Sequence, residues 1–190
     1  MTIDRKFEDA NIAGLILAGG RGMRMGGLDK ALVEYAGKRM IEHVAPKLSL
    51  LAKQIFISRQ NDQHDLSKFG DIIFDKKPDQ GPLSGLVTCL EVISKQGFEF
   101  VALAAVDTPV WPDDLYRNLF STCRPHAVVS MEGRINPTIA LIDLKHLSGI
   151  INLYNQGERR LGAWIDAKSC GMFNIGKDEL INVNQFIKLL

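Results

Sequence analysis

A glycine-rich segment that carries three basic residues is the part of the sequence best suited to chemistry. Glycine occupies five of the nine positions from 19 to 27, and Arg21, Arg24 and Lys30 lie within or just after this stretch. Because glycine has no Cβ, backbone N–H groups there can approach an anion closely, and the cations attract it further. The segment follows the apolar run 12–17, as expected where a strand leads into a loop. The pattern predicts phosphate binding, and the alternative is a flexible turn with solvated basic side chains.

The spacing of these glycines excludes two well-known phosphate-binding loops. Gly22 and Gly27 are spaced as in a Walker loop, but Leu28 stands where that loop requires lysine. Gly20 and Gly22 begin a dinucleotide-binding fingerprint, but its third glycine is missing. A nucleotide would therefore be bound by a loop of another type.

Two carboxylates follow apolar runs further along the chain. Asp107 comes after the run 100–106, and Asp75 comes after the run 71–74. In open α/β sheets, ligands bind beyond the carboxyl ends of the strands, which is where both residues would lie. A carboxylate there suits Mg²⁺, and it can also accept hydrogen bonds from N–H groups of a bound ligand. The plainer alternative for each is a polar residue in an ordinary turn.

The elements that must position these residues are short apolar runs alternating with segments of helical periodicity. We expect strands over residues 12–17, 54–58, 71–74, 98–106, 127–131, 138–142, 171–174 and 181–183. Helices are expected over residues 39–52, with Pro46 as a kink or a late start, and over 83–95 and 113–120. This alternation predicts an α/β fold: a Rossmann-like, open, mostly parallel (mixed) sheet with helices on both faces.

Length and composition bound the remaining possibilities. The 190 residues suit one domain, in which residues 12–131 form the first part and residues 132–190 form a lobe over the cleft. A net charge of +1 excludes a global electrostatic attraction to nucleic acid or to an anionic membrane. No apolar run is long enough to span a bilayer, so we expect a cytoplasmic protein without a signal peptide. Three widely spaced cysteines indicate reduced, buried thiols.

Several segments together resemble a known family. The string LAGGRGMRMGGLDKAL is similar to the signature of nucleotidyltransferases, which join a nucleoside monophosphate to a phosphorylated acceptor and release pyrophosphate. Further matches narrow the resemblance to the molybdenum cofactor guanylyltransferases of the MobA type; they are Gly81-Pro82-Leu83-Ser84-Gly85, Asp107-Thr108-Pro109, Asn136-Pro137-Thr138, Gly157-Glu158-Arg159-Arg160 and Asn182-Val183-Asn184.

The resemblance implies transfer of GMP from GTP to the terminal phosphate of molybdopterin, with release of pyrophosphate. A phosphate oxygen needs no general base at neutral pH, so the protein would position groups and neutralise charge with the help of Mg²⁺. GTP and molybdopterin would be the substrates, with residues 12–131 as the nucleotide-binding part and residues 132–190 as the acceptor-binding lobe. Transient contacts with other molybdenum cofactor biosynthesis proteins and a monomer or weak homo-oligomer are also expected.

The resemblance also assigns roles to individual residues. The catalytic residues would be Arg24, Lys30 and Asp107, with Asp107 as the metal ligand. The nucleotide would contact Leu17, Ala18, Gly19, Gly20, Lys30, Ser58, Asp75 and Asp107, and the acceptor would contact Arg159, Arg160, Asn182 and Asn184. Asn184, or less favourably Asn182, is also a candidate second metal ligand. The chain departs from the family at Ser58, where asparagine is usual, and at Asn136, where histidine is frequent.

Other functions fit parts of the pattern. A cytidylyltransferase acting on the same pterin, or a sugar-phosphate nucleotidylyltransferase, would share the glycine-rich segment. A GTP- or pterin-binding carrier without catalysis is a second alternative, although such a carrier would be expected to have lost Asp107 or the loop cations. A purely structural module explains the α/β pattern but not the glycines beside the cations.

Overall fold

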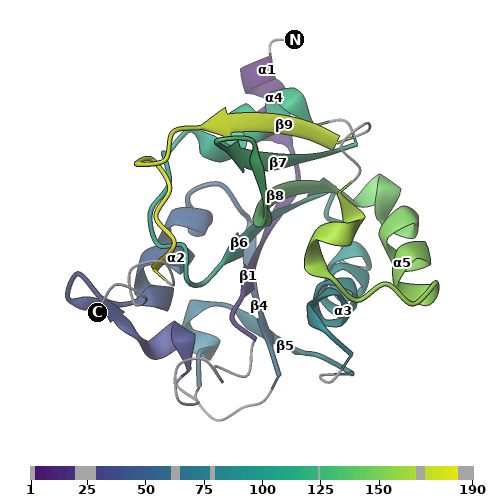
Figure 1. Ribbon diagram of the computed structural model, residues 1–190, viewed down its shortest axis with the longest axis horizontal. Helices are drawn as coiled ribbons and strands as arrows, with labels where there is room; N and C mark the ends of the chain where they lie inside the picture. The colour runs from purple at the N-terminus through teal and green to yellow at the C-terminus, as the bar shows by residue number, and fades with distance from the viewer. Residues whose placement is uncertain are drawn as a thin grey trace.

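Apolar strands build one seven-stranded sheet at the centre of the computed structural model, which describes residues 3–19, 29–60, 65–77, 80–123, 125–165 and 170–183 (Figure 1). The strand order is β5-β4-β1-β6-β8-β7-β9. The strands are β1 (Ile12–Leu17), β4 (Gln54–Arg59), β5 (Asp71–Phe74), β6 (Phe100–Ala105), β7 (His126–Met131), β8 (Arg134–Asp143) and β9 (Cys170–Ile175).

The pairing of the strands brings the ends of several of them to one edge. β1 pairs in parallel with β4 and with β6, and β4 pairs in parallel with β5. β8 is antiparallel to both β6 and β7, and β9 is again parallel to β7. Leu17 is in register with Ser58 on one side and with Ala105 on the other. The expected open, mostly parallel, mixed sheet is therefore confirmed, and its register places the carboxyl ends of β1, β4 and β6 side by side.

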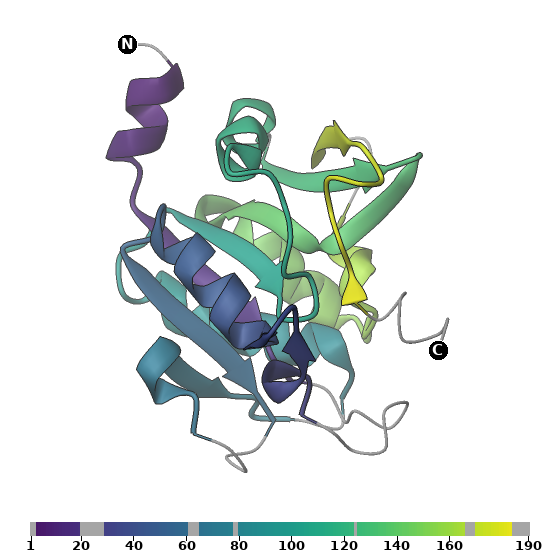
Figure 2. The same cartoon turned by 90° about the vertical axis from the view of Figure 1, so that its left-hand side faces the viewer.

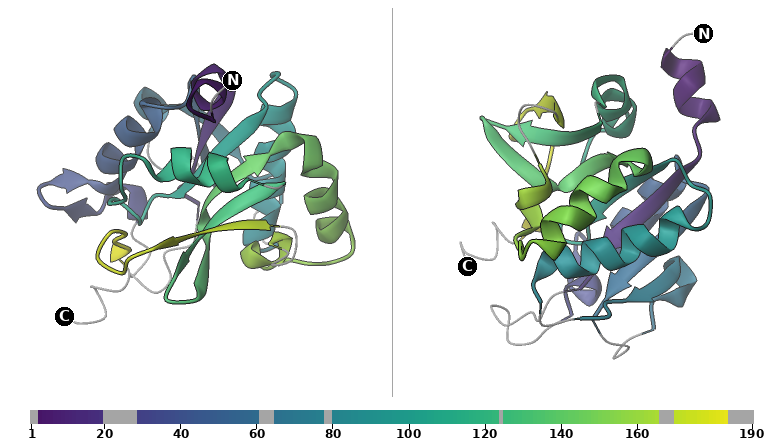
Figure 3. Two further views of the ribbon diagram at one scale, coloured as in Figure 1. Left: turned by 90° about the horizontal axis from the view of Figure 1, so that it is seen from above. Right: turned by 90° about the vertical axis from the view of Figure 1, so that its right-hand side faces the viewer.

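Helices cover both faces of the sheet, which explains why its strands read as continuous apolar runs. On one face α2 (Met40–Ser49) and α4 (Leu115–Thr122) bury apolar side chains against the sheet (Figure 2). On the other face α3 (Pro82–Ser94) and α5 (Leu147–Asn155) do the same (Figure 3). Successive residues of the central strands alternate between the two cores: Leu15 faces α3, and Ile16 faces α2.

The sequence prediction was accurate for most strands and incomplete for the helices. Of the eight expected strands, seven form; residues 181–183 instead make a single bridge, between Ile181 and Val110. α2 begins at Met40 and runs through Pro46, so the proline does not mark a late start. The elements that the sequence reasoning missed include α1 (Ile3–Asp9), α5 and the hairpin of β2 (Glu34–Tyr35) and β3 (Lys38–Arg39).

The residues after 132 contribute to the same sheet as those before. β8 inserts between β6 and β7, and β9 forms the edge next to β7. β8 therefore pairs on both sides with strands from the first part of the chain. The division of labour between 12–131 and 132–190 stays a prediction.

The burial of the three cysteines agrees with the expectation from composition. Cys89 and Cys170 are buried, Cys123 is partly buried, and none of the three forms a disulfide. Burial raises the pKa of both Cys89 and Cys123 to about 12, so these thiols stay protonated at neutral pH. Within the described part of the chain, no helix is long and apolar enough to cross a bilayer.

A buried histidine at the start of β7 is expected to make stability pH-dependent. Burial and then the nearby His146 lower the pKa of His126 to about 4, although Asp143 acts in the opposite direction. Its Nδ1 accepts a hydrogen bond from the backbone N–H of Asp143 (3.1 Å). An unfolded histidine titrates near 6.5, so the unfolded chain takes up a proton first as the pH falls, and the folded state loses stability between about pH 6.5 and 4.

We predict that His126 lowers the free energy of unfolding by about 2 kcal/mol when the pH falls from 7.5 to 5. His126→Asn keeps an acceptor for the backbone N–H without a titrating ring, so this variant should lack that part of the pH dependence. Urea unfolding of both proteins at the two pH values measures the difference. Equal losses of stability in the two proteins would show that His126 does not titrate as described.

Candidate active site

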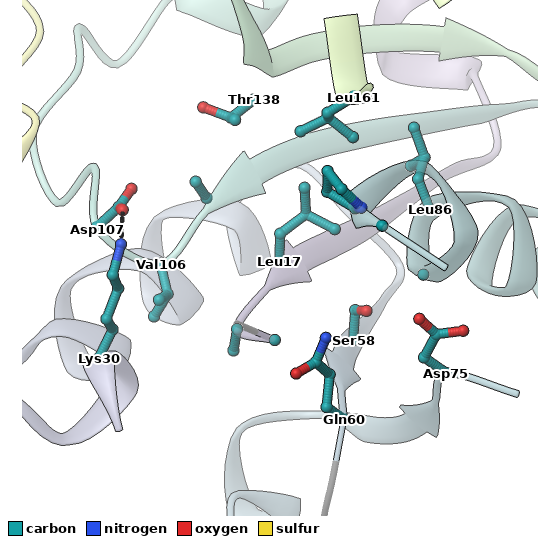
Figure 4. Close-up of a pocket in the computed structure, with 16 residues that line it drawn as sticks. Leu17, Lys30, Ser58, Gln60, Asp75, Leu86, Val106, Asp107, Thr138 and Leu161 are labelled. Carbon is teal, nitrogen blue, oxygen red and sulfur yellow. Dashed lines mark hydrogen bonds and ion pairs between the residues drawn. The ribbon is translucent and has the colours of Figure 1, made fainter. Parts of the chain in front are cut away.

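A cleft opens at the carboxyl edge of β1, β4 and β6, where the register brings their ends together (Figure 4). Seven of the residues predicted to contact substrate line it; they are Leu17, Ala18, Gly19, Lys30, Ser58, Asp75 and Asp107. They come from five separate stretches of the chain. The rule that ligands bind beyond the strand ends therefore located the cleft correctly.

The chain enters the cleft from the end of β1, through Leu17, Ala18 and Gly19. The backbone N–H of Ala18 donates to the carbonyl of Ser58 (3.2 Å), so the chain continues alongside β4 for one residue beyond the strand. Gly19 follows it on the cleft wall. Gly20 and Arg24, which were predicted to contact nucleotide phosphates, lie outside the described residues, as does Arg21.

Lys30 and Asp107 meet on one side of the cleft although 77 positions separate them. Lys30 Nζ donates to Asp107 Oδ2 at 2.9 Å, as the dashed line in Figure 4 shows. The Asp107 side chain is 14% exposed and that of Lys30 is 33% exposed, so a ligand in the cleft can reach both. Lys30 is held in place by the short 3-10 turn Lys30–Leu32, which Asp29 caps by accepting from the backbone N–H of Ala31 (3.0 Å).

The segment that contains Asn182 is fastened to the loop after β6. Asn182 Nδ2 donates to Asp107 Oδ1 (3.3 Å) and to Thr108 Oγ1 (3.4 Å). The backbone N–H of Val183 donates to the carbonyl of Asp107 (2.9 Å). Asn182 thus lies beside the predicted metal ligand, and its amide nitrogen is directed at the Asp107 carboxylate. Asn184 lies outside the described residues.

The far side of the cleft holds a buried carboxylate. Asp75 is 9% exposed, and its Oδ1 accepts from Ser84 Oγ (3.0 Å) and from the backbone N–H of Lys77 (2.9 Å). A Cβ added to Gly85 would lie 3.5 Å from Asp75 Oδ2 and 3.4 Å from Ser58 Oγ, so glycine here leaves room beside both groups. The structure therefore brings Asp75 and Ser58 together as predicted. It also adds Ser84, which the sequence analysis noted only as part of a motif.

Arg159 and Arg160 do not line the cleft. The Arg159 guanidinium donates to the carbonyls of Tyr154 (2.7 Å) and Glu158 (2.8 Å) and stacks over the Tyr154 ring at 4.4 Å. Arg160 is exposed and forms an ion pair with Glu158 (2.8 Å), and the hydrogen bonds from its side chain and backbone lower the pKa of Glu158 to about 2. Both guanidinium groups are therefore engaged within the protein, and their contact with an acceptor stays a prediction.

The backbone of Arg159 has a structural task of its own. Its carbonyl accepts from the N–H of Leu83 (3.2 Å), in the first turn of α3. Gly81, just before that helix, has a φ of +85°, and a Cβ there would come within 3.0 Å of the same carbonyl. Only glycine satisfies both conditions without strain. The motif at 81–85 thus joins the segment at 157–160 through backbone contacts.

The metal-binding potential of the site rests on a single carboxylate. Within the described part of the chain, no group of three His, Cys, Asp or Glu side chains is arranged to hold a metal ion. Asp107 nevertheless offers the hard oxygen donors that Mg²⁺ prefers, and this ion often binds through one or two carboxylates together with substrate phosphates and water. The donor chemistry thus fits a metal that arrives with its nucleotide.

Comparison with known proteins agrees with the geometry. A family model described as the MobA-like NTP transferase domain matches residues 14–169. The chain is similar to a molybdenum cofactor guanylyltransferase from Haemophilus influenzae (strain 86-028NP), at 36% identity over 156 residues, which is 79% of this chain and 80% of the relative.

Solved structures share the fold at lower identity. One is the molybdopterin-guanine dinucleotide biosynthesis protein A from Archaeoglobus fulgidus, with a TM-score of 0.64, 20% identity, and coverage of 94% of this chain and 88% of that one. Another is a Mycobacterium tuberculosis protein in complex with manganese, with a TM-score of 0.68, 12% identity, and coverage of 95% and 98%. From the family model and the relative at 36% identity, the chain belongs to the MobA-like NTP transferase family.

Proposed function

We propose that the protein transfers GMP from GTP to the terminal phosphate of molybdopterin, forming molybdopterin guanine dinucleotide and pyrophosphate. The observation that carries this proposal is the arrangement of the cleft. Gly19, just after β1, and the pair Lys30–Asp107 lie on one side of the cleft, and the buried carboxylate of Asp75 lies on the other. The first set suits a triphosphate, and the second suits the edge of a guanine base. The name of the Haemophilus influenzae relative agrees with this assignment.

The phosphate side of the cleft would act by charge and position. Lys30 would move from Asp107 to a phosphate oxygen when GTP binds, with Arg24 and the backbone of Gly20 as further phosphate contacts. Asp107 would hold Mg²⁺, which neutralises charge on the phosphates and on the departing pyrophosphate. The attacking group is a phosphate oxygen that is already ionised, so no general base is required. The Mycobacterium tuberculosis neighbour, whose structure contains manganese, supports a divalent ion in this fold.

The base side of the cleft would select guanine. Asp75 Oδ1 is occupied by Ser84 and by the backbone of Lys77, whereas Oδ2 has no hydrogen-bond partner within the described residues. Guanine presents two neighbouring donors, N1–H and the exocyclic amine, and a buried carboxylate accepts such bonds strongly. Cytosine and adenine lack this pair of donors. Leu17, Ala18, Gly19 and Ser58 would complete the nucleotide contacts.

The acceptor would enter from the side formed by the later part of the chain. Thr138, on β8, lines the cleft, and its Oγ1 donates to Asn136 Oδ1 (2.7 Å). Residues 132–190 would supply the acceptor contacts, through Asn182 and Asn184 near Asp107 and through Arg159 and Arg160 at the rim. This assignment follows the family resemblance and the position of Asn182 beside Asp107.

The proposal is tested by measuring pyrophosphate release with molybdopterin, Mg²⁺ and each of the four nucleoside triphosphates. We expect release with GTP and formation of the guanine dinucleotide, with the other nucleotides at least about 10-fold slower. A preference for CTP would point to a cytidylyltransferase. Binding of GTP without any release in the presence of molybdopterin would point to a carrier. Either result would remove the guanylyltransferase assignment.

A further inference from the structure

A buried ion pair joins the end of β4 to Asp29, which lies two residues after the glycine-rich segment. Arg59, the last residue of β4, donates from Nη2 to Asp29 Oδ2 (2.7 Å) and from Nη1 to Asp29 Oδ1 (3.0 Å). The two side chains are only 5% and 9% exposed. Neither residue appeared among the candidate site residues, because nothing in the sequence links positions 29 and 59.

The same guanidinium also reaches the near end of the segment. Nη1 of Arg59 donates to the carbonyl of Ala18 (3.3 Å), which is the last residue but one before the undescribed residues 20–28. One side chain therefore holds the chain just before and just after the glycines. Burying two charges is costly, and the cost is offset only when both are well hydrogen-bonded, as they are in this two-pronged arrangement.

The ion pair is connected to both sides of the cleft. Asp29 caps the turn that carries Lys30, so the position of Lys30 depends on where Asp29 is held. The carbonyl of Arg59 accepts from the backbone N–H of Asp75 (2.9 Å). Arg59 therefore contacts, through its side chain, the neighbour of the phosphate-binding lysine and, through its backbone, the residue proposed to bind the base.

We propose that Arg59 is a positioning residue for the triphosphate site, acting through Asp29 on Lys30 and on both ends of the glycine-rich segment. The inference rests on the proposed function, since it concerns the binding of GTP phosphates. The Arg59 side chain is not among the groups that line the cleft. Its guanidinium fixes the spacing between Ala18 and Asp29, and so sets the span that the intervening glycines must bridge. Lysine cannot replace it, because an ammonium group does not form the fork.

The test removes the ion pair without leaving a buried charge alone. In the double variant Arg59→Met/Asp29→Asn both charges are absent, and the asparagine oxygen still caps the turn. We expect kcat/KM for GTP to fall about 10- to 100-fold. The inhibition constant of guanosine, which has no phosphate, should stay within about twofold, because Asp75 and its hydrogen bonds to Ser84 and Lys77 are retained. Arg117→Met is the matched control, since Arg117 forms an ion pair with Glu8 away from the cleft.

A second measurement separates positioning from a merely structural role. If Arg59 acts through Lys30, removing the ion pair from a Lys30→Met protein should lower kcat/KM little further, because the group being positioned is already gone. Additive losses, or an unchanged kcat/KM for GTP in the double variant, would overturn the inference. Should the double variant fail to fold, Arg59→Lys is compared with the unmodified protein in the same way. Its kcat/KM for GTP should fall by a smaller factor, and its inhibition constant for guanosine should not change.

Failure of the inference can be told apart from failure of the proposed function. If the unmodified protein shows no turnover of GTP, the proposed function fails. If the unmodified protein turns over GTP and the double variant does so equally well, only the role of Arg59 fails.

Discussion

Replacing Asp107 by asparagine is expected to lower guanylyl transfer on the order of 10³-fold while leaving the protein folded. The carboxylate lies just beyond β6, partly open to the cleft, where Lys30 bonds one of its oxygens and Asn182 bonds the other. Asparagine keeps the shape of the side chain but loses the charge that would hold Mg²⁺ against the phosphates. The measurement is kcat for pyrophosphate release at saturating GTP and molybdopterin.

The matched control for this prediction is Asp113→Asn. Asp113 also forms an ion pair with a lysine, Lys47, but its side chain is 87% exposed and lies outside the cleft. Its removal should leave turnover unchanged, because exposed ion pairs contribute little. Turnover of Asp107→Asn within about 10-fold of the unmodified protein would refute the assignment of Asp107 as metal ligand.

The second large effect concerns the choice of base. Asp75→Asn is expected to lower kcat/KM for GTP about 100-fold, because the amide replaces one accepting oxygen by a donor that faces the donors of guanine. Inosine triphosphate is a suitable probe because its base is guanine without the exocyclic amine. The unmodified protein should therefore prefer GTP over inosine triphosphate, and Asp75→Asn should lose most of that preference.

Comparison of the two nucleotides with both proteins tests this prediction. Asp71→Asn is a suitable control. Asp71 begins β5, the strand that ends just before Asp75, but its side chain is exposed and accepts a hydrogen bond from Gln54 instead of facing the cleft. If Asp75→Asn keeps the preference of the unmodified protein for GTP, base recognition must reside in other residues. A loss of stability alone would lower the rates with both nucleotides equally.

The position of the cleft could be predicted because it depends on local patterns. The strand ending at Leu17 and the run ending before Asp107 are visible as apolar segments, and parallel strands necessarily bring such ends together. The pairing of Lys30 with Asp107 joins residues 77 positions apart, so the sequence predicts only that both belong to the same site. Gly20, Arg24 and Asn184 lie outside the described residues, so their roles remain predictions from the resemblance.

Other features could not be predicted because they depend on contacts between distant residues. The insertion of β8 between β6 and β7 is a matter of strand order, which periodicity does not encode. The ion pair of Arg59 with Asp29 requires knowing that the turn before Lys30 packs against the end of β4. Arg159 looked like a free cation in the sequence, but its guanidinium is bonded to backbone carbonyls of its own segment.

We propose that the cleft binds GTP by both its triphosphate and its base. Titration calorimetry with GTP, CTP and ATP in the presence of Mg²⁺, without acceptor so that no transfer occurs, measures this binding directly. We expect GTP to bind at least about 10-fold more tightly than CTP or ATP. Asp75→Asn should remove this difference, whereas Lys30→Met should weaken the binding of all three nucleotides alike. Equal affinities for the three nucleotides in the unmodified protein, or tighter binding of CTP, would contradict this proposal.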